Sequence, residues 1–395
     1  MATGTNAGFF AKKKPPAVLK HKLLEHYMPP FVGMVGSTSR GGRVVLLDGY
    51  AGEGRYSDGS LGSPALTLNT AAAMRAMGRS LECVFVEQSA KSFAQLNQVV
   101  VEYQARGVVC RAVKGRVENE LPNVIRDAKD VPLFLFLDPC GLGVPFTSLT
   151  EMLNGPRAQT YPQTEILLNF SDKAVRHIGG QLAPAAKDRS GLPSLDKACG
   201  GWWRDAYASA ATAADAEPGV QAVVEGYRQR LGEATGMFVR AAPVRTKPGR
   251  LPLYHLVFAT RSRYGLWVFA DALAHAQQAW RAAQWEEEPD DPHELGVLFG
   301  ADTMLASTEE ALKQQATAGI AANVRRVLDT QSTFKLVDEV DEVFGDWYGI
   351  APETWVRDAV KQLHGEGHTS STGVGPRVRN LVVERSTPRQ QQAPA

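Results

Sequence analysis

Short apolar runs alternate with segments of helical spacing between residues 44 and 170. Runs rich in Val, Leu, Ile and Phe occupy residues 44–47, 83–86, 108–113, 133–137 and 166–170. Between them, apolar side chains recur at helical spacing over residues 65–77, 90–104 and 147–153. Strands that are apolar on both faces are typical of buried parallel sheets. The alternation therefore predicts an α/β fold, a doubly wound parallel sheet with right-handed crossovers.

The pattern changes after residue 170. Residues 171–235 are rich in Gly and Pro and predict an insertion that ends in a helix over residues 220–231. Two strand-like runs follow, residues 237–244 and 254–260, and a short basic turn joins them. An edge hairpin with one antiparallel strand resembles the edge geometry of class I methyltransferases. The predicted fold class is thus a class I methyltransferase-like Rossmann sheet with an antiparallel edge hairpin.

The remaining chain predicts a small second module. Residues 333–343 and 351–364 are amphipathic, and a short β segment follows at residues 381–383. Helix, helix and wing is the order of a winged helix, although any small helical cap shows similar spacing. The predicted parts are a flexible basic N-terminus (1–18), the Rossmann-like domain (19–285) with a helical insertion near 171–235, a linker and helical region (286–330), a winged-helix-like module (331–385) and a disordered tail (386–395).

Composition limits the class of protein. The chain has 395 residues, of which 44% are hydrophobic and 22% charged, a balance typical of two or three globular domains. With a net charge of +1, no overall electrostatic attraction to nucleic acid or membrane is expected. No apolar run approaches the length of a membrane helix, and no signal peptide is recognisable. Four Cys without a C-x-x-C pair favour a reducing cytoplasm and argue against zinc, iron–sulfur clusters and disulfides.

The most informative motif joins the first strand to a glycine-rich turn. Asp48 ends the strand, where open α/β sheets place their ligands. The turn that follows contains Gly49, Tyr50, Ala51, Gly52 and Gly54. A carboxylate directly before this turn would repel a pyrophosphate but suits an ammonium group, and S-adenosylmethionine carries one. The motif therefore predicts a nucleoside pocket, with an ordinary tight turn as the alternative interpretation.

A second carboxylate, Glu87, ends the next strand. Its position suits a residue that accepts hydrogen bonds from ribose hydroxyls. Glu87 lies further from the glycine turn than the roughly 20 residues usual in dinucleotide folds. The excess matches a polar loop at residues 55–64, which is interpreted as an insertion.

The third motif predicts the reacting end of the site. The apolar run at residues 133–137 delivers Asp138, Pro139 and Cys140 to the same edge. Amino-methyltransferases carry a similar Asp/Asn-Pro-Pro-aromatic loop, which orients the target amine. The aromatic residue is absent here, and Phe146 or Tyr50 is a candidate replacement.

Other interpretations of this loop stay open. Asp138 and Pro139 also fit a helix cap followed by a structural proline. Cys140 is an acid–base group, a methyl carrier or, as the simpler interpretation, a packing residue. Asn169 and Asp172 are expected at the rim of the pocket, with Asp172 capping a helix.

Several of these segments together resemble the three-Cys-motif partner proteins (TcmP). The similarity rests on residues 20–24, 47–56, 62–64, 86–87, 138–141, 168–170 and 255–260, and on the C-terminal module. The resemblance implies a methyltransferase-like domain and a partner protein with a three-cysteine radical S-adenosylmethionine motif. Where the family often has Gly-Asp after the third strand, this chain has Gly115-Arg116. Glu118 is therefore the candidate for the adenine amine.

Three functions remain compatible with the sequence. The leading one is an S-adenosylmethionine-dependent methyltransferase whose acceptor is a nucleic acid base or another amine or hydroxyl. The second is a non-catalytic partner protein that docks nucleic acid or the radical enzyme. The third, a nucleotide hydrolase or nuclease, requires Asp48, Glu87 and Asp138 to converge on a metal. His21 and His26 share a helix without further ligands, so no metal site is expected there.

Overall fold

The computed structural model describes residues 15–212, 214–286 and 301–386. The chain divides into two compact units. The first comprises Met1–Ala17 and Met28–Ser262, and the second comprises Val18–Tyr27 and Arg263–Ala395. Helix α1 (Pro15–Thr38) thus contributes residues to both units.

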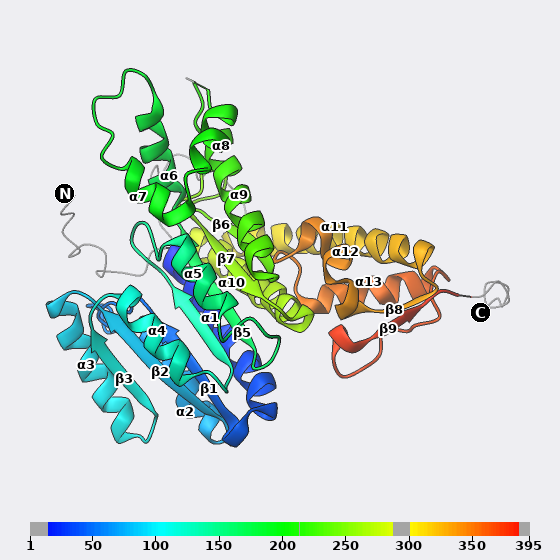
Figure 1. Cartoon of the computed structure of the whole chain (residues 1–395). Coiled ribbons are helices and arrows are strands. Elements are labelled where there is room, and N and C mark those ends of the chain that lie inside the picture. Colours follow the sequence, from blue (N-terminus) through cyan, green and yellow to red (C-terminus); the bar gives the residue numbers. More distant parts are fainter. Residues whose placement is uncertain (1–14, 213, 287–300, 387–395) are drawn as a thin grey trace. The chain divides into compact units, whose positions relative to one another are not determined.

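A seven-stranded sheet forms the centre of the first unit (Figure 1). Its order is β3-β2-β1-β4-β5-β7-β6, and β7 runs antiparallel to β5 and β6 while the other pairs are parallel. This is the strand order of class I methyltransferases, so the predicted fold class is confirmed. The strands are β1 (Arg43–Asp48), β2 (Ser80–Glu87), β3 (Cys110–Lys114), β4 (Leu133–Leu137), β5 (Thr164–Phe170), β6 (Phe238–Val244) and β7 (Tyr254–Thr260).

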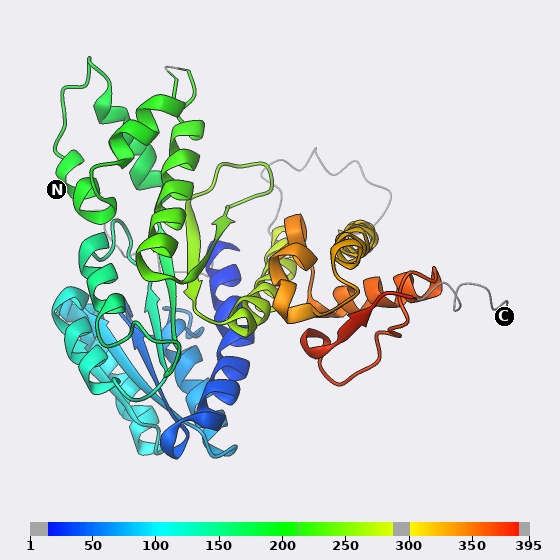
Figure 2. The same cartoon turned by 45° about the vertical axis from the view of Figure 1, so that its right-hand side comes forward.

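Helices cover both faces of this sheet (Figures 1 and 2). On one face, Phe31 of α1 packs against Phe134 of β4 with ring centroids 5.4 Å apart. The right-handed crossovers place α2 (Ser63–Arg75) and α3 (Ala90–Ala105) on this face too. A continuous core lies on the other face, under α4 (Val117–Asp127), α5 (Phe146–Asn154), α6 (Asp172–Gly179), α7 (Leu192–Cys199), α8 (Trp203–Ala210) and α9 (Glu217–Thr235).

Local sequence explains where most of these helices begin. Pro64 occupies the first turn of α2, where its missing N–H costs nothing. The Ser89 hydroxyl caps α3 by accepting from the Ser92 backbone N–H at 3.3 Å. Helix α4 was not predicted, because Pro122 lies inside it and proline usually marks the end of a helix.

The second unit is a smaller α+β assembly. Its two strands, β8 and β9, pair antiparallel. The predicted helix at residues 351–364 is confirmed, whereas the predicted helix at residues 333–343 is wrong over its first half. The elements are α10 (Arg263–Glu286), α11 (Ala301–Thr330), β8 (Thr333–Lys335), a 3₁₀ turn (Leu336–Glu339), α12 (Val340–Phe344), α13 (Glu353–Gly365) and β9 (Val382–Glu384).

The error has a physical cause. Phe334 and Leu336 are buried on either side of half-buried Lys335, which is the alternation of a strand, and it outweighs the helical spacing further along. After α13, the Ser370 backbone N–H donates to the Glu384 carbonyl at 3.0 Å, beside the bridge of Thr369 with Arg385. A second wing strand is not assigned among the described residues, so the winged helix stays a prediction. Residues 287–300, in the first half of the predicted linker and helical region (286–330), lie outside the described residues.

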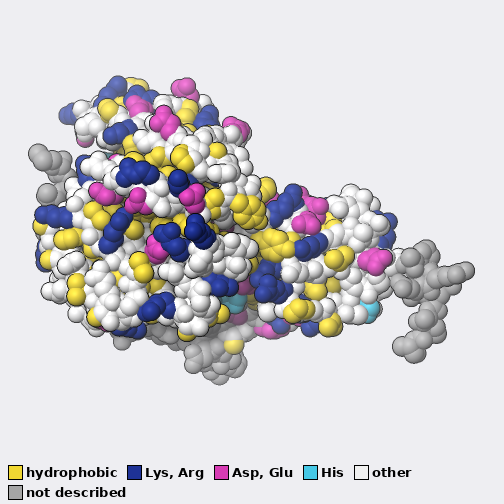
Figure 3. Space-filling view, turned by 60° about the horizontal axis from the view of Figure 1, so that its bottom comes forward, with side chains coloured by type: hydrophobic (Ala, Val, Ile, Leu, Met, Phe, Trp, Pro, Cys, Tyr) yellow, Lys and Arg dark blue, Asp and Glu magenta, His cyan; other side chains and the backbone are white. Residues whose placement is uncertain are grey.

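Charge on the surface is mixed. On the face shown in Figure 3, Lys and Arg side chains alternate with Asp and Glu over the larger unit. This agrees with the net charge of +1. Among the described residues, no helix combines the length and apolar character needed to cross a membrane.

Candidate functional site

Four polar side chains end neighbouring strands at the carboxyl edge of the sheet, the edge at which β1 to β5 terminate. In sheet order they are Glu87 at the end of β2, Asp48 at the end of β1, Asp138 directly after β4 and Asn169 on β5. Asp48 is in register with Phe136 of β4 and with Phe85 of β2, so the three strands end close to the same level. The structure therefore brings the three predicted carboxylates to one edge.

Asp48 holds the glycine turn in place through buried hydrogen bonds. Its side chain is only 1% exposed. One carboxylate oxygen accepts from the Tyr50 backbone N–H at 3.2 Å, and the other accepts from the Ser63 hydroxyl at 3.0 Å. Asp48 thus ties the turn to the first residue of α2. Sequence reasoning did not assign Ser63 a role, although its place directly before Pro64 marks a helix start.

Glu87 holds the same turn from the neighbouring strand. Its Oε2 accepts from the Gly52 backbone N–H at 2.9 Å, and its Oε1 accepts from the Ser89 backbone N–H at 2.6 Å. The Ala51 N–H donates to the Val86 carbonyl at 3.0 Å beside this contact. Glu87 is half-buried, and each carboxylate oxygen has more than one lone pair. Its carboxylate is therefore both fixed in place and able to accept further hydrogen bonds.

The three glycines of the turn are required for two different reasons. Gly52 and Gly54 have φ of 68° and 82°, a left-handed conformation that favours glycine. Gly49 does not. A Cβ at Gly49 would lie 2.7 Å from a methyl of Val117 and 2.9 Å from a methyl of Leu137. Close packing of α4 and β4, rather than approach to a ligand, explains glycine at this position.

Glu118 lies beside the turn as well. Burial raises the pKa of the Tyr50 phenol, and the charge of Glu118 raises it further. The Arg116 guanidinium contacts Glu118 at 3.4 Å, and the Gly115 N–H donates to the Glu87 carbonyl at 3.0 Å. The start of α4 therefore adjoins both the glycine turn and Glu87. Arg116 neutralises part of the charge of Glu118, the residue that the sequence predicts to contact adenine.

The Asp138 loop forms the other end of the edge. Asp138 is half-buried and accepts from the Asn169 amide nitrogen at 3.0 Å, which fixes the direction of the carboxylate. The Asn169 amide oxygen is buried without a hydrogen-bond partner among the described residues. Pro139 is buried and Cys140 is exposed, whereas the other three cysteines are buried.

Little space is left around the Asp138 loop. Phe146, a candidate for the missing aromatic, packs edge-on against Tyr227 at 5.4 Å, whereas Tyr50 belongs to the glycine turn. Behind the loop lies a hollow of about 30 Å³, room for about two water molecules and not for a base. Pro139, Val144, Phe170 and Tyr227 are among its lining residues.

Asp172 corrects one expectation from the sequence. Ser171, not Asp172, caps α6, since the Ser171 hydroxyl accepts from the Ala174 N–H at 3.2 Å. Asp172 is fully buried and its Oδ1 lies 2.8 Å from Nδ1 of His255 on β7. No group of three His, Cys, Asp or Glu side chains placed to hold a metal ion occurs in the described part of the chain.

Comparisons with known proteins give structural likenesses only. No family model and no curated protein matches the sequence. The methyltransferase domain of bacterial CtHen1-CN is 9% identical, with 60% of this chain and 99% of that chain covered and a TM-score of 0.28. An uncharacterised protein of Listeria monocytogenes serotype 4b is 11% identical (84% and 98% covered, TM-score 0.26). Geranyl diphosphate methyltransferase in complex with SAM is 12% identical (59% and 85% covered, TM-score 0.23). TM-scores this low do not identify a fold, so its assignment rests on the strand order.

Proposed function

We propose that this protein is an S-adenosylmethionine-dependent methyltransferase that acts on an amine or hydroxyl acceptor. The observation that carries the proposal is the hydrogen bond from Gly52 to Glu87, which joins the turn after β1 to the carboxylate after β2. This contact fixes a half-buried acidic group beside a glycine turn at the edge where open α/β sheets bind nucleosides. The strand order of the sheet supports the same function.

Along the carboxyl edge of the sheet, different residues suit different parts of the cofactor. Glu87 would accept hydrogen bonds from the ribose hydroxyls, and Glu118 at the start of α4 would face the adenine. Because Asp48 is buried beneath the turn, we assign it to holding the turn, whose backbone carbonyls would meet the methionine ammonium. When bound, the cofactor supplies an activated methyl group. The protein supplies alignment, which accounts for a large share of the rate in such reactions.

Asp138 would orient the acceptor. Its contact with Asn169 directs the carboxylate and restricts its rotation. A carboxylate so held accepts a hydrogen bond from an N–H or O–H group and turns the lone pair of that group toward the methyl. The nucleic acid base that the sequence favours stays one member of this acceptor class. Arg379 in the second unit, a candidate for contact with the phosphates of such an acceptor, is paired with Glu353 at 3.4 Å.

Calorimetry with S-adenosylmethionine and its homocysteine product tests the proposal. Glu87→Gln should weaken binding of both ligands at least about tenfold, or about 1.4 kcal/mol. Glu82→Gln is the matched control, because Glu82 lies on the same strand but pairs with Arg43 at 2.7 Å. Binding should be unchanged in this variant. Absence of binding to the wild-type protein at millimolar ligand would overturn the proposal.

Asp138→Ala separates catalysis from binding. This variant should bind both ligands as the wild type does and lose methyl transfer to any acceptor. The assay combines radiolabelled methyl donor with cell extract, with and without the partner that the TcmP resemblance predicts. If the wild type binds the cofactor yet labels nothing under either condition, the partner-protein function replaces the enzymatic one.

A further inference from the structure

A pocket of about 210 Å³ lies at the amino edge of the sheet, where β1, β2 and β3 begin side by side. Its lining comes from the end of α2 and from the starts of these strands, and it includes Gly41, Arg75, Gly78, Arg79, Ser80 and Val109. Ser80 is the first of the 8 residues of β2, and Glu87 is the last. A strand of this length spans about 23 Å, so this amino-edge pocket is distinct from the glycine turn.

Arg75 lines the pocket from the last turn of α2. Its Nη1 donates to the Arg106 carbonyl at 2.8 Å, and glycine at position 107 leaves room for the guanidinium, because a Cβ there would overlap Nη1. Backbone N–H groups of Gly78 and Arg79 already satisfy the last carbonyls of α2, so the side chain is not needed as a helix cap. The other N–H groups of the Arg75 guanidinium have no partner among the described residues.

Arg79 lines the same pocket from the position before β2. Its aliphatic part lies against Gly36 of α1, where an added Cβ would come within 2.8 Å of the Arg79 Cδ. Its Nη1 donates to the Gly78 carbonyl at 3.3 Å, and its Nε is buried without a partner among the described residues. Buried donors of this kind are uncommon in folded proteins, and an ion or water bound beside the group is one explanation for them.

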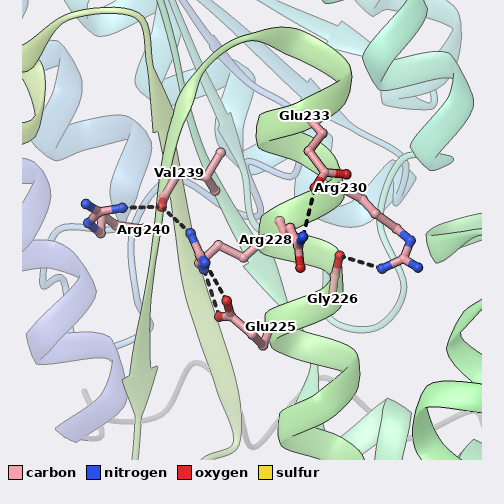
Figure 4. A network of polar contacts seen from close by, with 8 residues as sticks. Glu225, Gly226, Arg228, Arg230, Glu233, Val239 and Arg240 are labelled. Atoms are coloured by element: carbon pink, nitrogen blue, oxygen red, sulfur yellow. Dashed lines mark hydrogen bonds and ion pairs between the residues drawn. The ribbon is translucent and has the colours of Figure 1, made fainter.

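The two arginines differ from an arginine of α9 in their partners. Figure 4 shows the Arg228 guanidinium beside the Glu225 carboxylate, and its Nε donates to that carboxylate at 2.7 Å. No Asp or Glu side chain in the described part of the chain pairs with Arg75 or Arg79. They are also the only charged side chains among the described residues that line the pocket. The lining is therefore positively charged, and the ligand that it suits is an anion.

The number of guanidinium groups favours a phosphate over a carboxylate. One guanidinium fork offers two parallel N–H donors, which the two oxygens of a carboxylate satisfy. A phosphate group has the oxygens and the charge to contact two forks. The pocket exceeds the volume of a phosphate group, taken as four water-sized atoms of about 30 Å³ each. Space remains for an organic part beside Val109, an exposed apolar residue of the lining.

We propose that the amino-edge pocket binds a small organic phosphate monoester, whose phosphate group Arg75 and Arg79 contact together. The inference does not rest on the proposed methyltransferase activity. Glu87→Gln should leave phosphate binding intact, and changes to the two arginines should leave S-adenosylmethionine binding intact. Failure of one proposal is thus distinguishable from failure of the other.

Calorimetry of the full chain at low ionic strength tests this site with phenyl phosphate as the probe. We expect saturable binding of one phenyl phosphate per chain, weaker binding of inorganic phosphate and no binding of phenol. A single-stranded oligonucleotide without terminal phosphates is the arm for a nucleic acid backbone. If only the oligonucleotide binds, or if phenyl phosphate does not saturate the protein at millimolar concentration, the proposal is wrong.

Two variants assign the binding to this pocket. Arg75→Gln and Arg79→Gln should each weaken phenyl phosphate binding at least about tenfold. Arg126→Gln is the matched control, because it removes the same charge from an exposed arginine of α4 outside the pocket, and it should leave binding unchanged. Equal weakening by Arg126→Gln would mean that the probe responds to net charge alone, which overturns the proposal.

A structural role of Arg75 is separated by its contact with the Arg106 carbonyl, which fastens the segment before β3 to α2. Circular dichroism checks the fold of Arg75→Gln, and Arg79→Gln carries the test if that variant is unfolded. If either folded variant binds phenyl phosphate as tightly as the wild type, the two arginines do not contact the phosphate together and the proposal is wrong.

Discussion

Acidic side chains at the two ends of the carboxyl edge of the sheet differ in their burial and in their hydrogen-bond partners. At the β1–β2 end, Glu87 is half-buried and both its oxygens accept from backbone N–H groups of turns. At the β7 end, Asp172 is fully buried and its partner is an imidazole. The first arrangement fixes the turns and leaves the Glu87 carboxylate itself able to contact a ligand. In the second, the Asp172 carboxylate is buried, and its partner His255 is the residue that can contact one.

The difference suggests that one sheet edge supports two kinds of recognition. A carboxylate that remains accessible suits neutral donors such as ribose hydroxyls. A histidine backed by a buried carboxylate suits an anion or a proton to be moved. The two ends also face opposite layers of helices, because Glu87 and His255 have opposite positions in the alternation of their strands.

The largest effect is expected from Asp48→Ala. The substitution leaves the Tyr50 N–H and the Ser63 hydroxyl without their acceptor inside the protein. We expect a loss of about 3 kcal/mol in the free energy of unfolding, measured by urea denaturation, together with loss of cofactor binding.

Asp58→Ala provides the matched control for this change. Asp58 is an exposed carboxylate of the same loop region and accepts from the Ser60 N–H at 2.8 Å. Because water replaces that contact, the loss should be below about 1 kcal/mol. Equal losses from the two variants would show that burial of Asp48 does not matter for the turn.

The two ends also differ in how far the sequence revealed them. Asp48 and Glu87 follow apolar strands directly, and parallel strands with short turns bring such residues to a common edge, so their positions could be predicted. Asp172 and His255 are 83 residues apart, and their contact depends on the antiparallel register of β7 against β5. No local pattern encodes that register. Asp172 therefore resembled a helix cap, which is the role of its neighbour Ser171.

The errors in the predicted secondary structure arise likewise where local sequence patterns do not determine the structure. The strands and the hairpin were predicted because each carries its own apolar pattern. Helix α4 was missed because Pro122 is a local signal against a helix that tertiary packing of Leu121 and Val124 overrides. The strand β8 was read as helix because three residues are too few to show a period against the helical spacing that follows.

A moderate effect is expected from Gly54→Ala. At φ of 82°, alanine is strained, and its Cβ would lie 3.2 Å from a methyl of Val99. We expect a loss of about 2 kcal/mol in unfolding free energy and weaker binding of S-adenosylmethionine. Gly59→Ala is the control, because its φ of 80° imposes the same strain while no atom lies within 4 Å of the new Cβ.

Because Gly54 and Gly59 have similar φ, the difference between their alanine variants measures the effect of packing around Gly54. Gly59→Ala should cost about 1 kcal/mol by urea denaturation and leave cofactor binding intact. If both variants bind the cofactor equally well, the conformation of the turn at Gly54 has no part in recognition. The proposed function would then depend on Glu87 alone.

The smallest effect on stability is expected from Glu225→Gln, at the β7–β6 end. Hydrogen bonds from Arg228 lower the pKa of Glu225 below its usual 4.5. The ionised form is therefore favoured by folding, and this stabilisation is present above about pH 4.5 and lost as the pH falls through the folded pKa. Because the side chain is 60% exposed, the difference between wild type and variant at pH 7 should be below about 0.5 kcal/mol and vanish in acid.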